Sequence, residues 1–194
     1  VPPAPKLSVA NNMMLALNGD VSTKVRALAA QNVAFRQLSL FRVEGSKRTK
    51  LSDAEWRSDE QALPRLPPGR YEVQARAIDR FGVESMTSEP LTLRVIGAQL
   101  PEGARLANDS ILLGRSGRVK LIGTDGLEAS YGRANVFIPV PKDVGLARGE
   151  STLLRLREPG GKQELGIKLE PRTIKADVEI GPKSARWPGE PLQV

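Results

Sequence analysis

The side chains of this sequence that could take part in chemistry are carboxylates and cations, because the chain contains no histidine and no cysteine. A Ser-His-Asp triad, a thiolate nucleophile, a disulfide, a zinc site and a Cys-ligated iron–sulfur cluster each need one of those two side chains. The composition therefore excludes these sites, and it leaves acid–base catalysis and charge-based binding to consider.

Two groups of carboxylates are the candidates for catalysis or metal binding. Asp59 and Glu60 are adjacent, and Asp125 and Glu128 lie three residues apart. General acid–base catalysis needs two carboxyl groups on rigid elements about 5 to 9.5 Å apart, which neighbours in a charged loop do not establish. The acidic spacing of a dedicated calcium loop is also missing. We therefore expect a protein that is not an enzyme, with no catalytic residue, metal or cofactor.

Basic residues are the candidates for a binding surface. Lysine and arginine number 29 against 22 acidic residues, for a formal charge of +7, which favours anionic partners but also suits a merely soluble surface. The densest cluster is Lys47, Arg48 and Lys50, on the expected return strand of a hairpin. It could grip phosphate or a glycan carboxylate, or it could protect an exposed sheet edge from pairing.

A second candidate surface lies in the other half of the chain. It is predicted to be one basic sheet face formed by Arg115, Arg118, Lys120, Arg155 and Arg157. Binding of single-stranded nucleic acid would require aromatic side chains for base stacking. The core is expected to take the aromatic residues Phe35, Phe41, Tyr71 and Phe137. Nucleic acid is therefore not expected as a partner.

The stretch that organises the chain covers residues 66–85. After a Pro-Pro-Gly turn, apolar Tyr71, Val73 and Ala75 alternate with polar neighbours, which is typical of a half-buried strand. Asp79 and Gly82 then favour a turn, and a second alternation follows over residues 91–95. We interpret the two as a closing hairpin of an antiparallel β-sandwich.

Other segments also predict strands. Alternation indicates strands at residues 7–9, 13–17 and 23–29, although a helix over residues 21–30 is the competing interpretation. Residues 35–43 are apolar on nearly both faces, which favours a central strand. Trp56 is expected either to pack in the core or to follow a short helix capped by Asp53. No apolar run is long enough to span a membrane.

The two halves of the sequence repeat one pattern, which predicts two domains. Residues 24–28 correspond to 118–122, residues 66–69 to 146–149, residues 73–77 to 152–156, and residues 91–95 to 165–169. The boundary is placed at the segment 97–103, which contains Pro101 and two glycines. We therefore predict an all-β fold with one β-sandwich over residues 1–97 and a second, shorter one over 98–194. Residues 174–180 are left either as its last strand or as the first of a further module.

The motif of residues 69–85, GRYEVQARAIDRFGVES, carries a resemblance to a family. Preceded by a leucine-proline turn, it resembles the last hairpin of immunoglobulin-like and fibronectin type III-like modules of bacterial cell-envelope proteins, especially the tail modules that follow FecR-type domains. In the second half Glu158 replaces Asp79 and the strand lacks a tyrosine. The resemblance implies two tandem sandwiches of this kind in the periplasm or at the cell surface, and it implies no catalytic residues.

These observations predict a non-enzymatic envelope scaffold that spaces or binds other components, with envelope proteins or an anionic cell-wall polymer as partners and no small-molecule substrate. A carbohydrate- or peptidoglycan-binding module is the alternative, and it would need aromatic side chains exposed on a sheet face. A hydrolase or lyase would need a cleft with converging carboxylates. A nucleic-acid binder would show a steep salt dependence of affinity.

Overall fold

The protein is an all-β structure. The computed structural model describes residues 1–16, 19–29, 33–107, 110–114, 117–146 and 150–171. These residues contain no helix, and therefore no helix that is long and apolar enough to span a membrane. The strands are β1 (Lys6–Val9), β2 (Met13–Leu15), β3 (Lys24–Leu28), β4 (Val33–Glu44), β5 (Lys47–Trp56), β6 (Glu60–Ala62), β7 (Gly69–Asp79), β8 (Leu91–Gln99), β9 (Arg105–Ala107), β10 (Ser110–Leu113), β11 (Arg118–Ile122), β12 (Glu128–Tyr131), β13 (Ile138–Pro139), β14 (Val144–Gly145), β15 (Thr152–Arg157) and β16 (Glu164–Pro171).

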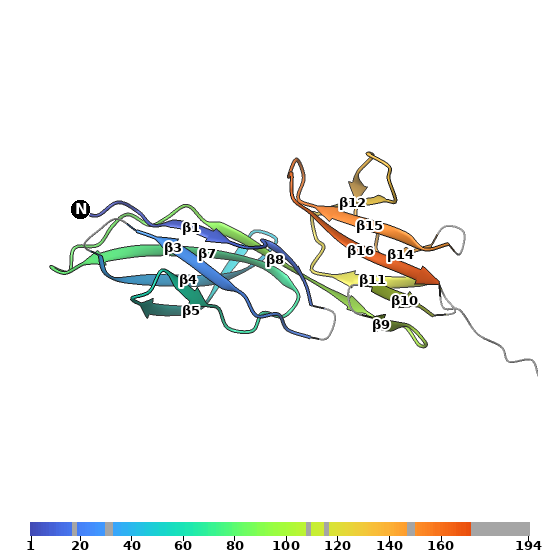
Figure 1. Ribbon diagram of the computed structural model, residues 1–194, viewed down its shortest axis with the longest axis horizontal. Coiled ribbons are helices and arrows are strands. Elements are labelled where there is room, and N and C mark those ends of the chain that lie inside the picture. The colour runs from blue at the N-terminus through green and yellow to red at the C-terminus, as the bar shows by residue number, and fades with distance from the viewer. Residues whose placement is uncertain (17–18, 30–32, 108–109, 115–116, 147–149, 172–194) are drawn as a thin grey trace, which may run out of the picture.

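The strands form three sheets, of which one extends through the whole molecule. The long sheet has the order β14-β11-β8-β7-β4-β5, with β2 added beside β8. A sheet β1-β3-β6 covers one end of it, and a sheet β13-β12-β15-β16-β10-β9 covers the other. The molecule is elongated, and β8 runs from the first half into the second (Figure 1).

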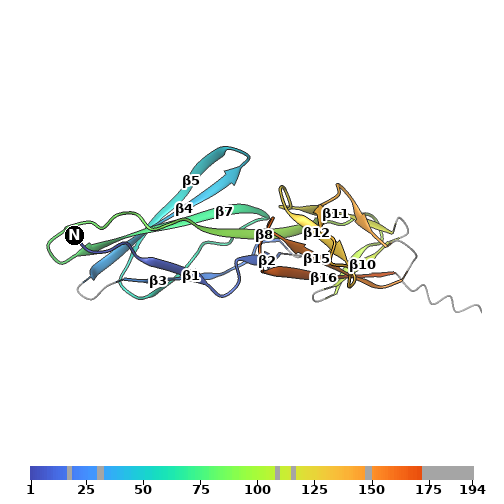
Figure 2. The ribbon, with the colours of Figure 1, turned by 90° about the horizontal axis from the view of Figure 1, so that it is seen from above.

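The two covering sheets enclose two separate cores against the long sheet. The first core contains Val25 and Ala27 of β3 together with side chains of β4, β7 and β8. The second contains Leu154 and Leu156 of β15 together with side chains of β8, β10, β11 and β16. Figure 2, seen from above, shows the two groups of strands one after the other along the long axis.

The two cores lie on opposite faces of the long sheet. Successive side chains of a strand point to opposite faces. In β8, Leu93 and Val95 are buried in the first core, whereas Ile96 is buried in the second and Ala98 packs against it. Strand β2 follows the same rule, with Met13 in the second core and Met14 against the first. One face of β8 thus packs in the first core, and farther along the strand the other face packs in the second core.

Most strand predictions are confirmed. Residues 24–28 form strand β3, with alternate residues exposed and buried, and not a helix. Strand β4 is central, between β7 and β5. Trp56 ends β5 with 6% of its surface exposed, so it packs in the core and no helix begins at Asp53. The predicted strand at 174–180 lies outside the described residues.

The first part of the predicted boundary segment 97–103 lies within a strand. Gly97, Ala98 and Gln99 do not form a linker, because they continue β8 and pair with Ile122, Leu121 and Lys120 of β11, respectively. Close packing accounts for the glycine at position 97, because a side-chain carbon there would lie 2.4 Å from Cγ of Pro68. The division into domains at residue 97 stays a prediction, and the structure joins the two parts by one strand.

The halves share a pairing feature that sequence patterns did not indicate. The prediction of antiparallel sheets holds for all described ladders except two, in which β2 runs parallel to β8 and β10 runs parallel to β16. In each half, an early strand thus lies beside the last strand of that half. The matched hairpins β7-β8 and β15-β16 are both antiparallel.

Tyr71 fixes the turn before β7. Its side chain is fully buried, and its hydroxyl donates a 2.7 Å hydrogen bond to the carbonyl oxygen of Pro67, four residues upstream. This is the geometry of a tyrosine corner. Burial raises the pKa of the Tyr71 hydroxyl, because the phenolate would lose its hydration.

Replacing Tyr71 by Phe should lower the free energy of unfolding at pH 7 by about 1 kcal/mol, because the hydrogen bond from the buried Tyr71 side chain to the Pro67 carbonyl oxygen is lost. Because the pKa of Tyr71 is raised in the folded state, its hydroxyl makes its full contribution to stability below the ordinary tyrosine pKa of about 10. That contribution decreases as the pH rises above this value. The difference between the two proteins should therefore shrink above pH 10. Denaturant unfolding at pH 7 and 10.5 measures this, and a difference that grows at high pH would contradict it.

Candidate functional site

The predicted cluster Lys47, Arg48 and Lys50 lies on an edge strand. All three residues are exposed on β5, which is the last strand of the long sheet. The edge-protection interpretation therefore fits the position of this strand. The backbone of Lys47 pairs with Glu44 across the hairpin turn, which places Lys47 at its tip.

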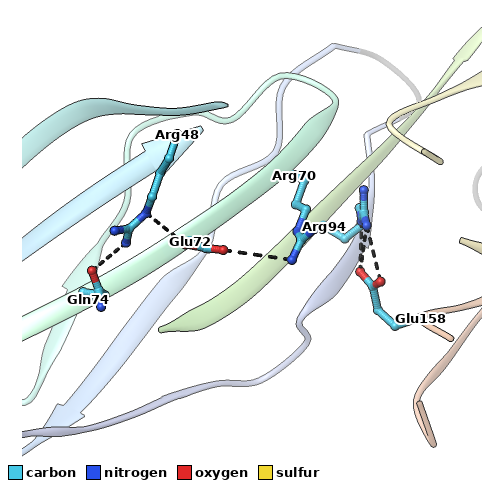
Figure 3. A network of polar contacts seen from close by, with 6 residues as sticks. All are labelled: Arg48, Arg70, Glu72, Gln74, Arg94 and Glu158. Atoms are coloured by element: carbon cyan, nitrogen blue, oxygen red, sulfur yellow. Dashed lines mark hydrogen bonds and ion pairs between the residues drawn. The ribbon is translucent and has the colours of Figure 1, made fainter. Parts of the chain in front are cut away.

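Arg48 reaches across the sheet toward β7. Its Nε lies 2.9 Å from Oε2 of Glu72, and its Nη2 donates a 2.5 Å hydrogen bond to Oε1 of Gln74. Its guanidinium lies 3.6 Å from the ring centroid of Phe41 on β4. Figure 3 shows Arg48 over Glu72 and Gln74, with Arg70 on the other side of Glu72. Arg48 is therefore held by three neighbours.

Lys50 forms a second fixed cation on the same face. Its Nζ lies 2.5 Å from Oδ2 of Asp53, whose Oδ1 accepts a 2.5 Å hydrogen bond from the Ser39 hydroxyl. The hydrogen bonds from Lys50 and Ser39 lower the pKa of Asp53 below its ordinary value. Asp53 therefore stays ionised at neutral pH and holds the lysine in place.

A shallow groove of about 300 Å³ lies between these cations and β7. It is lined by Gln37, Ser39, Phe41, Arg48, Lys50, Gln74, Ala75, Arg76 and Thr87. Arg76 is fixed as well, with Nε donating a 2.9 Å hydrogen bond to Thr87 and Nη1 lying 3.2 Å from Glu84. The groove therefore unites two residues of the predicted cluster with a third cation, Arg76, that sequence reasoning did not assign to a site.

The second predicted surface is not one sheet face. Arg118 and Lys120 are exposed on β11 of the long sheet, whereas Arg155 and Arg157 belong to β15 of the covering sheet. The alternate residues of both strands fill the same core from opposite sides, so the two pairs extend from different sheets. Arg115 lies outside the described residues.

Arg155 and Arg157 are engaged by neighbouring groups. Arg157 lies 3.0 Å from Oε2 of Glu128 and 3.6 Å from the ring centroid of Phe137. Arg155 lies 3.3 Å from Glu164 and donates a hydrogen bond to the carbonyl oxygen of Ala134. Since each charge has an acidic partner, these arginines contribute little net positive field.

The expectation that the core takes four aromatic residues is wrong for three of them. Tyr71 is in the first core, but Phe35, Phe41 and Phe137 are not among the buried side chains. Phe137 precedes β13 in a loop, and Phe41 projects from β4 to the outer face. An arginine guanidinium lies over the ring of Phe41 and another lies over the ring of Phe137. Such a cation can cover an aromatic face that would otherwise be covered by apolar side chains.

Three of the four candidate carboxylates serve as partners of arginines. Asp59 binds the buried Arg36 at 2.6 Å, Glu60 binds Arg26 at 3.0 Å, and Glu128 binds Arg157. A hollow of about 530 Å³ beside Asp125 and Glu128 is lined by residues 124–128 together with Lys120, Leu121, Pro139, Val140, Pro141, Lys142 and Pro159. Within the described ranges, no group of three or more acidic side chains is placed to hold a metal ion.

A buried ion pair joins the two halves. Arg94 of β8, only 4% exposed, donates from Nε to Oε1 of Glu158 at 3.0 Å and from Nη2 to Oε2 at 3.3 Å (Figure 3). Its Nη1 also lies 3.5 Å from the carbonyl oxygen of Gly123. Glu158 follows β15, so this two-pronged contact ties the covering sheet to the long sheet.

The same junction contains a close backbone approach. Gly123 lies between β11 and β12 with φ at +80°, and a side-chain carbon there would lie 2.3 Å from the carbonyl oxygen of Val95 and 2.9 Å from the amide of Gly69. Arg94 also stands directly opposite Arg70 on β7, and like charges in that position repel. Glu72 and Glu158 balance the two arginines.

Sequence reasoning paired Glu158 with Asp79 as equivalent turn residues, and it missed the junction. Asp79 does act on its own turn, because its Oδ1 accepts hydrogen bonds from the amides of Phe81 and Val83. Glu158, with a longer side chain, instead reaches Arg94 of the other half. The difference between Asp79 and Glu158 indicates a changed role at this position, but it does not identify Arg94 as the partner.

No protein-family model matches the sequence, and no curated protein matches it either. The fold and the junction define an all-β protein in which one sheet carries a core on each face.

Replacing Glu158 by Gln should lower the free energy of unfolding by about 2 kcal/mol, because the buried Arg94 loses its counter-charge beside Arg70. The loss is smaller than for a fully buried pair, since the Glu158 side chain is 34% exposed. Glu60→Gln is the matched control, because it breaks an exposed pair with Arg26 that is worth less than about 1 kcal/mol. Equal losses for the two variants in denaturant unfolding would contradict the role of the junction.

Proposed function

We propose that this chain is a non-enzymatic scaffold of the bacterial cell envelope that holds other envelope components, either proteins or wall polymer, at a fixed spacing. The observation that carries the proposal is the junction. Strand β8 belongs to both cores, and the Arg94–Glu158 pair locks the covering sheet onto it.

A shared strand has mechanical consequences that a linker does not have. Domains joined by a flexible segment reorient freely unless their interface is large and apolar. Here bending at the junction would break the β8–β11 ladder, remove Ile96 from its core and separate Arg94 from Glu158. A rigid, elongated body suits a spacer, because it transmits distance and orientation between its two ends.

Several features support modules of the immunoglobulin-like or fibronectin type III-like kind. The Tyr71–Pro67 hydrogen bond has the tyrosine-corner geometry of such folds. Each half places two sheets over an apolar core and closes with an antiparallel hairpin. Together with the resemblance of residues 69–85 to envelope modules, these features favour the periplasm or the cell surface as the location.

The described geometry favours the scaffold over its rivals. A sheet platform of bare aromatic rings for sugar stacking gains no support, because arginines lie over Phe41 and Phe137 and the exposed Phe81 lies in a turn. A hydrolase would need converging carboxylates, whereas Asp59, Glu60 and Glu128 bind separate arginines. The paired cations also give little of the concentrated positive field that a nucleic acid requires.

Fractionation of source cells, followed with an antibody against the chain, tests the proposal. The chain should be recovered in the envelope fraction, and a photo-crosslinking residue at the exposed position of Lys47 should yield a discrete adduct with an envelope component. A crosslinker at the buried position of Val73 is the negative control. Recovery of the chain in the cytosol would overturn the proposal.

A further inference from the structure

The groove on the outer face of β5, β4 and β7 is rich in hydrogen-bond donors. Its lining contains two guanidinium groups, one ammonium group, two side-chain amides and two hydroxyls, and no carboxylate. Guanidinium groups bind carboxylates with two parallel hydrogen bonds, whereas an ammonium group binds them as a point charge. The groove therefore suits a ligand that carries both carboxylate and hydroxyl groups.

The acidic residues of this region hold the cations in place without lining the groove. Glu72 holds Arg48 at 2.9 Å, Asp53 holds Lys50 at 2.5 Å, and Glu84 holds Arg76 at 3.2 Å. Ordering a long cationic side chain costs conformational entropy on binding. Because these three side chains are already restrained, a ligand would meet a site that is partly organised in advance.

Recognition in this groove does not depend on ring stacking. The guanidinium of Arg48 lies 3.6 Å from the ring centroid of Phe41, so it occupies one face of the only aromatic ring in the lining. A nucleobase or an apolar sugar face would compete with that contact. Hydrogen bonding is then the main mode of recognition, through Gln37, Gln74 and the cations.

We propose that this groove binds an acidic glycan, with the carboxylates of uronic-acid-type sugars held by Arg48, Lys50 and Arg76 and the hydroxyls by Gln37 and Gln74. The inference goes beyond the scaffold role and does not depend on it. The volume of about 300 Å³ is at the lower end of ligand sites, so the groove accepts a short stretch of the polymer.

The balance of charge distinguishes this ligand from a general polyanion. The three cations are matched by three acidic partners, Asp53, Glu72 and Glu84, so the groove has little long-range field. Duplex DNA draws its affinity mainly from the release of counterions by unpaired cations. Short-range contacts with fixed donors favour instead a chain with spaced carboxylates and neutral hydroxyls between them.

Titration calorimetry of the full chain with oligogalacturonate at about 0.15 M salt tests the proposal. Binding is expected to oligogalacturonate and not to neutral dextran. The double variant Lys50→Gln/Arg76→Gln should weaken it at least about tenfold, because two charge-assisted contacts are lost. The control double variant Arg105→Gln/Lys162→Gln removes the same charge at exposed positions outside the groove, and it should change affinity less than about twofold.

Side-chain amide signals in nuclear magnetic resonance spectra locate the ligand. The signals of Gln37 and Gln74 should shift on addition of oligogalacturonate, and unchanged melting temperatures should show that both double variants fold. Equal weakening by the two variants would overturn the proposal in favour of a diffuse field. Tighter binding of duplex DNA or polyphosphate than of oligogalacturonate, or no shift at either glutamine, would also overturn it.

Discussion

Strand β8 is the constraint on which the rest of the structure depends. Because the side chains of a strand alternate between two faces, one strand can bury Leu93 and Val95 on one side and Ile96 on the other. The sheet β1-β3-β6 covers one face of the long sheet, and the sheet β13-β12-β15-β16-β10-β9 covers the opposite face farther along. Arg94 lies on the same face of β8 as Ile96, at the point where the covering sheet begins to bury this face. Glu158, which follows β15 of the covering sheet, supplies the counter-charge to the buried Arg94.

The same transition explains the polar face of the first half. The residues that alternate with the core positions of β7, Arg70, Glu72, Gln74 and Arg76, share one face of the sheet with Arg94. Along β8 this face passes under the covering sheet, and along β4 and β5 it stays open and forms the groove. The network drawn in Figure 3 follows this face from Gln74 to Arg70, and Arg94 continues it to Glu158. Basic residues on this face are therefore held in fixed ion pairs.

Alternation in the sequence predicted most of the longer strands, but not the short strands β6, β9, β10, β12, β13 and β14. It located β3, β4, β7, β8, β15 and β16, and it identified the core positions of the two closing hairpins, because period two follows directly from strand geometry. The edge position of the Lys47, Arg48 and Lys50 cluster also followed from its charge. These features are local, since each depends on neighbours in the chain.

The features that alternation could not predict depend on which sheet a strand joins. Gly97 has the composition of a linker, but its small size is used for contact with Pro68 inside a continuous strand. Arg118 and Arg155 share a pattern but belong to different sheets. The Arg94–Glu158 contact spans 64 residues, and no local signal gives such a pairing. Phe41 looked like a core residue because the sequence does not show that Arg48 covers it.

The central claim is that the two cores form one rigid body through β8. The chain has no cysteine, so Lys6→Cys and Lys142→Cys would provide one spin label in each half. The distance between the labels, measured by double electron–electron resonance, tests the claim most directly. A single narrow distance distribution that broadens when Glu158 is replaced by Gln is the predicted result. A broad or multimodal distribution in the otherwise unaltered chain would contradict the account.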